Sequence, residues 1–211
     1  MGGFINLDSW KRREHFAIYR GFANPFWSIC ADVDVTQVRQ QSREGQDRSF
    51  SLAPIYVALA AANEIEAFRL RIRGDKVWLH DRVGISTTIL RADETFSFAI
   101  YPMADHFADF EIHARAEADI ARDVTSLHKP AEGRDDLIYH STIPWIRFTS
   151  FTNAIGHAGD SIPRLVFGRS TEEAGRWRMP VSVEVHHALV DGLDVARFFD
   201  RFERGLAAFN W

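Results

Sequence analysis

The sequence contains little cysteine, no long hydrophobic run and no cluster of positive charge. Its one cysteine, Cys30, excludes an internal disulfide framework and suits a reducing cytoplasm, where we expect the protein to reside. The most apolar stretch, residues 52–62 (LAPIYVALAAA), is too short to span a bilayer and predicts a buried helix. The first residues contain no apolar secretory core. No membrane or secretory signal is therefore indicated.

The charge balance argues against nucleic acid and anionic membranes as partners. The formal net charge is −4 and the sequence pI is about 6.1, so no long-range attraction to polyanions is expected. A length of 211 residues, of which 46% are hydrophobic, allows one sizeable core. Because no Pro-, Gly- or Ser-rich linker and no internal repeat divides the chain, we expect a single domain over residues 1–211.

Hydrophobic periodicity predicts long helices interleaved with strands. Helices are expected over residues 8–22, 51–68, 105–124 and 193–209, with a short helix beginning at Thr36. Strands are expected over residues 28–35, 84–90, 94–101, 138–151, 164–168 and 178–187, with a hairpin over 70–80 and a bend or sheet edge at Pro144. This order predicts an α+β fold, a two-layer sandwich in which helices pack on a mixed, mostly antiparallel sheet.

The stretch VSVEVHHALVDG, residues 181–192, ends a predicted strand with two histidines and an Asp-Gly pair. Neighbouring side chains on a strand point to opposite faces, so we expect one histidine to be packed and the other presented. That alternation, without a second ligand cluster, argues against a metal site. Imidazole is a natural general base at neutral pH. We expect Gly192 to permit a tight exit from the strand and Asp191 to brace it. The alternative is a structural histidine at a strand end.

Motifs along the whole chain resemble the chloramphenicol acetyltransferase family. HHALVDG resembles the family's HHxxxDG signature, and NLDSWKRREHFAIYR resembles its N-terminal helix. Between them FSLAPIYVALAAAN, ETFSF and STIPWIRFTSF follow in the family's order and at about its spacings. The resemblance implies the family's CoA-dependent acyltransferase fold and acetyl transfer from acetyl-CoA, as co-substrate, to a hydroxyl of chloramphenicol, with no metal.

The resemblance also implies roles for individual residues. His187 matches the general base and Ser141 the hydroxyl that hydrogen-bonds the oxyanion, while Asp191 and Arg12 match a structural ion pair. The walls of the acceptor pocket are implied at Ile18, Tyr19, Ala23, Pro25, Trp27, Phe96, Phe151 and Val166, and the coenzyme contacts at Trp145 and Arg169. Members are homotrimers with active sites at subunit boundaries. His187 would then come from one subunit and much of the acceptor pocket from its neighbour.

The choice of acceptor is open, because the chain departs from the family pattern at pocket positions. Val166 stands where threonine is common and has no hydroxyl to offer. One alternative keeps the chemistry and changes the acceptor to another small hydroxyl compound. A second is a non-catalytic trimeric binding module with the same fold. Dihydrolipoamide acyltransferases share the fold and a similar histidine motif, but they carry lipoyl and linker segments not found here.

Overall fold

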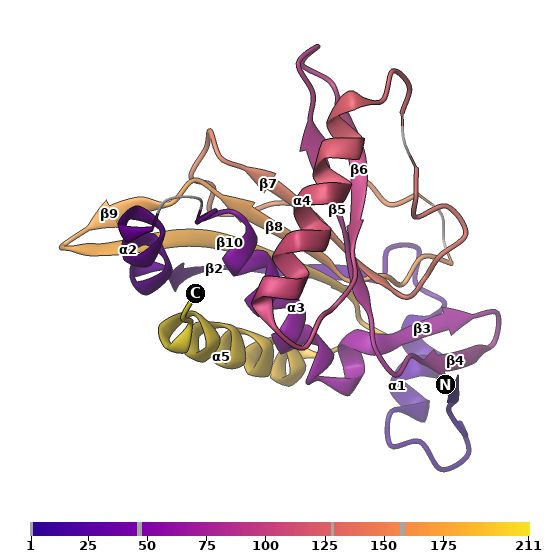
Figure 1. Ribbon diagram of the computed structural model, residues 1–211. Coiled ribbons are helices and arrows are strands. Elements are labelled where there is room, and N and C mark those ends of the chain that lie inside the picture. Colours follow the sequence, from indigo (N-terminus) through magenta and orange to yellow (C-terminus); the bar gives the residue numbers. More distant parts are fainter. Residues whose placement is uncertain (1, 46–47, 128, 157–158) are drawn as a thin grey trace.

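The structure is a computed structural model that describes residues 2–45, 48–127, 129–156 and 159–211. Within these ranges seven strands form one sheet in the order β2-β10-β8-β7-β5-β6, with β9 paired to β10 (Figure 1). The strands are β2 (Phe26–Asp34), β5 (Gly84–Leu90), β6 (Phe96–Tyr101), β7 (Leu137–Ile143), β8 (Arg164–Gly168), β9 (Thr171–Glu173) and β10 (Arg176–His186). Strand β7 runs parallel to both of its neighbours, β5 and β8, and the other pairs are antiparallel. The predicted mixed, mostly antiparallel sheet is confirmed.

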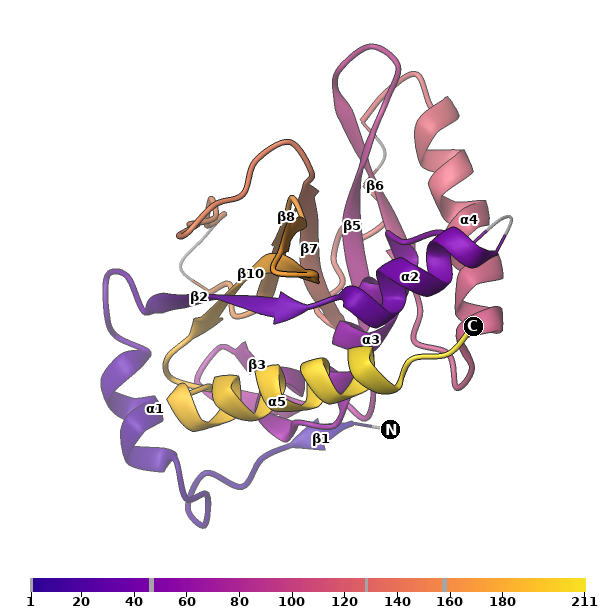
Figure 2. The ribbon, with the colours of Figure 1, turned by 90° about the vertical axis from the view of Figure 1, so that its left-hand side faces the viewer.

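The long helices gather on one face of this sheet, which gives the predicted two layers (Figures 1 and 2). They are α2 (Thr36–Glu44), α3 (Leu52–Asn63), α4 (Phe107–Asp123) and α5 (Gly192–Ala208). Helix α4 packs against β6, and α3 packs against α5. The opposite face of the sheet carries the irregular segment between β7 and β8 (Figure 2).

Aromatic stacking fixes α5 on the sheet. Phe198 of α5 stacks on Phe68 at 5.2 Å between ring centroids, and Phe202 stacks on Phe167 of β8 at 5.8 Å. Gly205 lets α5 approach α3 closely, because a Cβ there would lie 2.5 Å from a methyl carbon of Val57. This packing holds the N-terminus of α5, and the turn before it, in a fixed place at the end of β10.

The first helix, α1 (Arg13–Tyr19), is shorter than the predicted helix over 8–22. The side chain of Asn6 accepts a hydrogen bond from the Asp8 amide at 3.1 Å, and the Ser9 hydroxyl donates to the Asn6 carbonyl at 3.4 Å. These local bonds hold the chain in turns, so neither Asp8 nor Ser9 caps a helix. The predicted start of this helix is therefore wrong.

Helix α3 also ends earlier than predicted. The Asn63 side chain donates to the Leu59 carbonyl at 2.9 Å and to the Val83 carbonyl at 3.0 Å, and it accepts from the Val83 amide at 2.9 Å. These bonds tie the helix end to the residue before β5. A 3₁₀ turn (Glu66–Arg69) replaces the predicted continuation to residue 68.

Pro144 ends a strand in the middle of the sheet. Strand β7 stops at Ile143, directly before the proline, and lies between β5 and β8. Proline has no amide hydrogen to donate to the ladder, which accounts for the end of β7. Of the two alternatives predicted at Pro144, the sheet edge is wrong and the bend is confirmed, because Pro144 lies in a turn. Residues 144–163 form no strand in the part that the structure describes.

The predicted hairpin forms a small second sheet. Strands β3 (Leu70–Arg73) and β4 (Lys76–Leu79) pair in antiparallel fashion, and β1 (Gly3–Phe4) joins the free edge of β4. Gly74 occupies the turn with a φ of 64°, a left-handed conformation that glycine adopts without strain.

Candidate active site

The two histidines at the end of β10 occupy different environments, as alternation predicts. His186 is 2% exposed, its Nδ1 accepts from the Ala188 amide at 3.2 Å, and its ring meets Phe26 edge-on at 5.2 Å. Burial lowers the pKa of His186 to about 4. His187 is only half-buried. His186 is therefore the packed ring and His187 the presented one.

Aromatic rings and backbone bonds hold the His187 side chain in place. Tyr19 of α1 stacks on the imidazole at 4.1 Å between centroids, and Trp27 of β2 lies at 5.4 Å. The backbone amide of His187 donates to the Pro25 carbonyl at 2.9 Å. The imidazole is thus fixed between α1 and β2 before any substrate binds.

One hydrogen bond determines which ring nitrogen of His187 can act as a base. Nδ1 lies 3.2 Å from the Val190 carbonyl oxygen. A carbonyl only accepts, so in the neutral ring Nδ1 carries the hydrogen and Nε2 carries the lone pair. The geometry therefore prepares Nε2 to take up a proton.

The turn after His187 is held by an ion pair and a helix cap. Arg12 pairs with the Asp191 carboxylate and also donates to the His187 carbonyl at 3.2 Å. Asp191 is the N-cap of α5 and accepts from the amides of Leu193 at 3.1 Å and Asp194 at 3.4 Å. Burial alone would raise the pKa of Asp191, but the hydrogen bond and charge of Arg12, together with the two capped backbone amides, outweigh it and lower the pKa.

Gly192 does not form the tight exit from β10 that the sequence predicted for it. It is the first residue of α5, its φ lies outside the left-handed region, and a Cβ there would meet open space. The tight exit is instead made by the amides of Leu189 and Val190, which donate to the His186 carbonyl at 3.0 and 3.1 Å. The prediction for Gly192 is wrong, whereas the bracing by Asp191 is confirmed as a helix cap.

The cap and the ion pair at Asp191 can be separated by two substitutions. Asp191→Ala should lower the free energy of unfolding by more than the roughly 0.5–2 kcal/mol expected for a lost cap, because it removes both the cap of α5 and the ion pair to Arg12. Asp191→Asn should cost less, because asparagine caps as well as aspartate and only the charge facing Arg12 is lost. Chemical denaturation of both variants tests this. Equal losses in the two would show that the cap contributes nothing.

Ser141 lies in a different part of the chain, beside a cavity of about 1010 Å³. It sits on β7, with its hydroxyl 2.8 Å from that of Thr88 on β5. Phe96 and Phe151 also line this cavity. Among the described residues that line it, neither His187 nor its ring neighbours are found. One copy of the chain therefore does not bring Ser141 and His187 together around this cavity.

The remaining predicted site residues divide between buried and exposed positions. Val166 is buried on β8, with its Cα opposite that of Ser141, and it does not line the cavity. Ile18 is 59% exposed on α1, and Trp145 is 61% exposed just after β7. Arg169 is exposed at the end of β8, where its amide donates to the Ile146 carbonyl at 2.9 Å. Trp145 and Arg169 thus lie at the same end of two adjacent strands.

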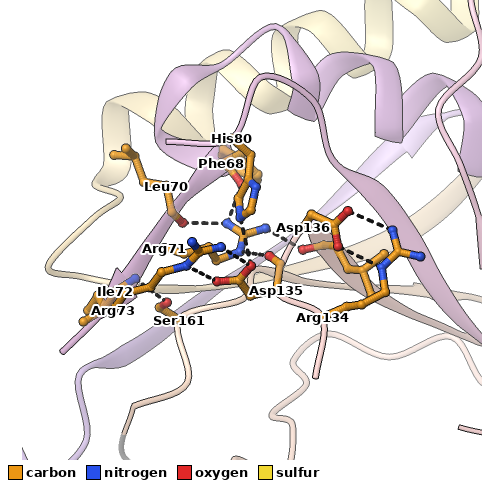
Figure 3. Close-up of polar contacts among 11 residues, drawn as sticks. Phe68, Leu70, Arg71, Ile72, Arg73, His80, Arg134, Asp135, Asp136 and Ser161 are labelled. Carbon is orange, nitrogen blue, oxygen red and sulfur yellow. Dashed lines mark hydrogen bonds and ion pairs between the residues drawn. The ribbon is translucent and has the colours of Figure 1, made fainter. Parts of the chain in front are cut away.

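A buried arginine next to the Ser141 strand has no counterpart among the predicted site residues. Arg71 is 1% exposed, and Figure 3 shows its guanidinium among backbone oxygens of two chain segments. It donates to the carbonyls of Phe68 at 2.9 Å, Asp135 at 2.6 Å and Leu137. Burial lowers the pKa of Arg71 to about 10, so it is still charged at neutral pH. Arg71 anchors the start of β7 to the hairpin.

Ion pairs surround this anchor. Arg73 makes two hydrogen bonds to the Asp135 carboxylate, at 2.8 and 2.7 Å, and His80 lies 3.1 Å from the same carboxylate. Arg134 pairs in the same way with Asp136 (Figure 3). The alternation of Arg71 and Arg73 along the hairpin is visible in the sequence. The sequence does not indicate that Asp135, 62 residues after Arg73, is the partner of that arginine.

Two buried histidines predict a loss of stability in mild acid. Burial lowers the pKa of His140 from 6.5 to about 3, and that of His186 from 6.5 to about 4. Below pH 6.5 the unfolded chain takes up these protons and the folded chain does not. The free energy of unfolding should therefore fall by about 1.4 kcal/mol per pH unit for each histidine as pH drops from 6.5 toward 4.

Denaturant unfolding at pH values between 7 and 4.5 measures this dependence. His140→Gln should make the slope shallower, and His113→Gln, on the exposed face of α4, should leave it unchanged. A free energy of unfolding that is constant between pH 6.5 and 5 would contradict the assignment.

The described residues offer neither a metal-binding cluster nor a membrane-spanning helix. In the described ranges no group of three or more His, Cys, Asp and Glu side chains could hold a metal ion. No helix in those ranges is long and apolar enough to cross a membrane.

Known proteins resemble this chain over almost its full length. A family model described as chloramphenicol acetyltransferase matches residues 3–203. A chloramphenicol acetyltransferase of Streptomyces acrimycini is 32% identical, covering 98% of this chain and 95% of the relative, and chloramphenicol acetyltransferase 3 of Escherichia coli is 28% identical, covering 94% of each. A solved chloramphenicol acetyltransferase structure, 30% identical, superposes with a TM-score of 0.88 over 98% of this chain and 100% of that one. The chain belongs to the chloramphenicol acetyltransferase family.

Proposed function

We propose that the protein transfers the acetyl group of acetyl-CoA to a hydroxyl of chloramphenicol. The observation that carries the proposal is the hydrogen bond of His187 Nδ1 to the Val190 carbonyl, which leaves Nε2 as a base. Family membership supports chloramphenicol as the acceptor and acetyl as the transferred group, since similar proteins are named chloramphenicol acetyltransferases.

In the proposed reaction Nε2 of His187 takes the proton from the acceptor hydroxyl. The acceptor oxygen then bonds to the thioester carbon, and negative charge develops on the former carbonyl oxygen. Ser141 donates its hydroxyl hydrogen to that oxyanion. When the intermediate collapses, the carbon–sulfur bond breaks, and the coenzyme A sulfur takes the proton back from the imidazolium.

The chain needs no acyl-enzyme intermediate for this transfer. Cys30 would be the candidate nucleophile, but burial, with a contribution from Asp32, raises its pKa above 9.0. A thiol in that state forms little thiolate at neutral pH. Direct transfer between two bound substrates, brought together by the protein, is therefore the favoured mechanism.

We infer that the working form is a homotrimer in which His187 of one copy faces the Ser141 cavity of another. Two observations support this assembly. His187 does not line the Ser141 cavity of its own chain. Large apolar side chains at predicted pocket positions are exposed in the single chain, with Ile18 at 59% and Phe96 at 50%, as expected for surfaces that a second copy covers.

The coenzyme is placed by Trp145 and Arg169. Both are exposed at the same end of the adjacent strands β7 and β8. An exposed indole offers an apolar surface to the coenzyme, and a guanidinium can pair with its phosphate oxygens. In this arrangement the thioester approaches Ser141 along β7 from the Trp145 end. We place the reaction in the cytoplasm.

Purified protein with acetyl-CoA and a panel of small alcohols, chloramphenicol included, tests the proposal. Release of the coenzyme A thiol should be rapid with chloramphenicol. Turnover with another alcohol only would favour the alternative acceptor. A folded protein with no turnover on any alcohol would favour a non-catalytic binding module.

A further inference from the structure

A second hydroxyl lies directly beside Ser141. The Oγ1 atom of Thr88 on β5 is 2.8 Å from Ser141 Oγ. The parallel register of β5 and β7 explains this distance. Thr87 pairs with His140 in this register. The residues that follow, Thr88 and Ser141, therefore also lie opposite each other, with their side chains on the other face of the sheet. Both hydroxyls line the cavity of about 1010 Å³.

The two flanks of Ser141 differ in chemistry. Thr88 on β5 offers a hydroxyl, whereas Val166, opposite Ser141 on β8, offers only methyl groups. The Thr88 side chain is therefore the strand neighbour that can orient the Ser141 hydroxyl. Strands β5 and β7 are joined by backbone hydrogen bonds, so the pair of hydroxyls is held at a fixed spacing.

A serine hydroxyl has one hydrogen to donate and can accept at its oxygen. The bond between Thr88 and Ser141 can run in either direction when no substrate is bound. If Ser141 donates its one hydrogen to an oxyanion, it cannot also donate to Thr88. In the bond between the two hydroxyls Thr88 must then be the donor and Ser141 the acceptor. The resulting chain runs from Thr88 to Ser141 to the oxyanion, and each bond polarises the next.

We propose that Thr88 is a positioning residue for acetyl transfer, which aims the hydrogen of Ser141 at the oxyanion. This inference rests on the proposed function. Thr88 itself does not touch the reacting atoms. Its contribution comes from orienting the donor before charge develops, so that less reorganisation is needed in the transition state.

The test measures steady-state kinetics of the full-length protein with acetyl-CoA and chloramphenicol. Thr88→Val keeps the shape of the side chain and removes the hydroxyl. We expect kcat to fall roughly 3- to 10-fold, the size of one neutral hydrogen bond, with KM for both substrates nearly unchanged because the loss is confined to the transition state. Thr88→Ser should restore kcat. Thr171→Val, on β9 and outside the cavity lining, removes a hydroxyl that makes no hydrogen bond in the described structure and should leave kcat unchanged.

A double-mutant cycle separates positioning from a merely structural role. If Thr88 acts through Ser141, then Thr88→Val combined with Ser141→Ala should be no slower than Ser141→Ala alone. An unchanged kcat in Thr88→Val, or a double variant slowed by the product of the single effects, would overturn the inference. Should Thr88→Val fail to fold, as judged by circular dichroism, Thr88→Ala carries the same expectations.

The same experiments distinguish failure of this inference from failure of the proposed function. An unaltered protein that transfers no acetyl group would overturn both. An active protein whose kcat does not respond to Thr88→Val would overturn the inference alone.

Discussion

Replacing His187 with alanine should lower kcat for acetyl transfer by about 10²–10⁴-fold, the contribution expected of a positioned general base. Nδ1 of this ring is committed to the Val190 carbonyl, and Tyr19 stacks on its face at 4.1 Å. The alanine side chain has no atom that can accept the proton of the acceptor hydroxyl in place of Nε2. The ring is half-buried, and the chain around it is also held by the bond from its own amide to the Pro25 carbonyl and by the Arg12–Asp191 pair. The variant should therefore still fold.

The matched control is His113→Ala, which removes an exposed imidazole from α4 and should leave kcat unchanged. Circular dichroism and denaturation of both variants establish that the fold is kept. A folded His187→Ala protein with the kcat of the unaltered chain would remove His187 from the mechanism.

Replacing Ser141 with alanine should lower kcat by about 10²–10³-fold, the usual effect of removing one oxyanion donor. KM should change little, because a bond made only in the transition state does not contribute to substrate binding. The variant should also lose less activity than His187→Ala under the same conditions. Ser42→Ala, on α2, is the matched control and should have no effect.

A different outcome would assign Ser141 another role. If KM for chloramphenicol rose while kcat stayed the same, Ser141 would be a ground-state contact to the acceptor rather than a donor to the oxyanion. Measuring kcat and KM separately for both substrates is therefore essential to this experiment.

Much of the sheet could be predicted from the sequence, because alternation is a local property. Strands β5 and β8 begin and end where the pattern placed them, at 84–90 and 164–168. The helix ends could not be predicted in the same way. Asn63 ends α3 through bonds to Val83, 20 residues along the chain, and Asn6 holds the turns that shorten α1. Propensity does not include such partners.

The site was predictable only where its signals lie close together in the sequence. The packed His186 and the presented His187 follow from strand alternation, and Asp191 precedes a helical pattern that it caps. The neighbours of Ser141 depend on strand order and register, which the sequence does not show. The sequence pattern therefore does not indicate Thr88, although its hydroxyl lies 2.8 Å from that of Ser141.

The central claim is that His187 and Ser141 act together from different copies of the chain. Refolding an equal mixture of His187→Ala and Ser141→Ala chains tests it. In a mixed oligomer each boundary takes His187 from one chain and Ser141 from its neighbour, and each residue is intact in half of the chains. Under random assembly about a quarter of the boundaries are therefore intact, and activity should rise to about a quarter of that of the unaltered protein. If both residues acted within one chain, every site would carry a defect. Activity no higher than the mean of the two inactive parents, in correctly assembled mixed oligomers, would contradict the account.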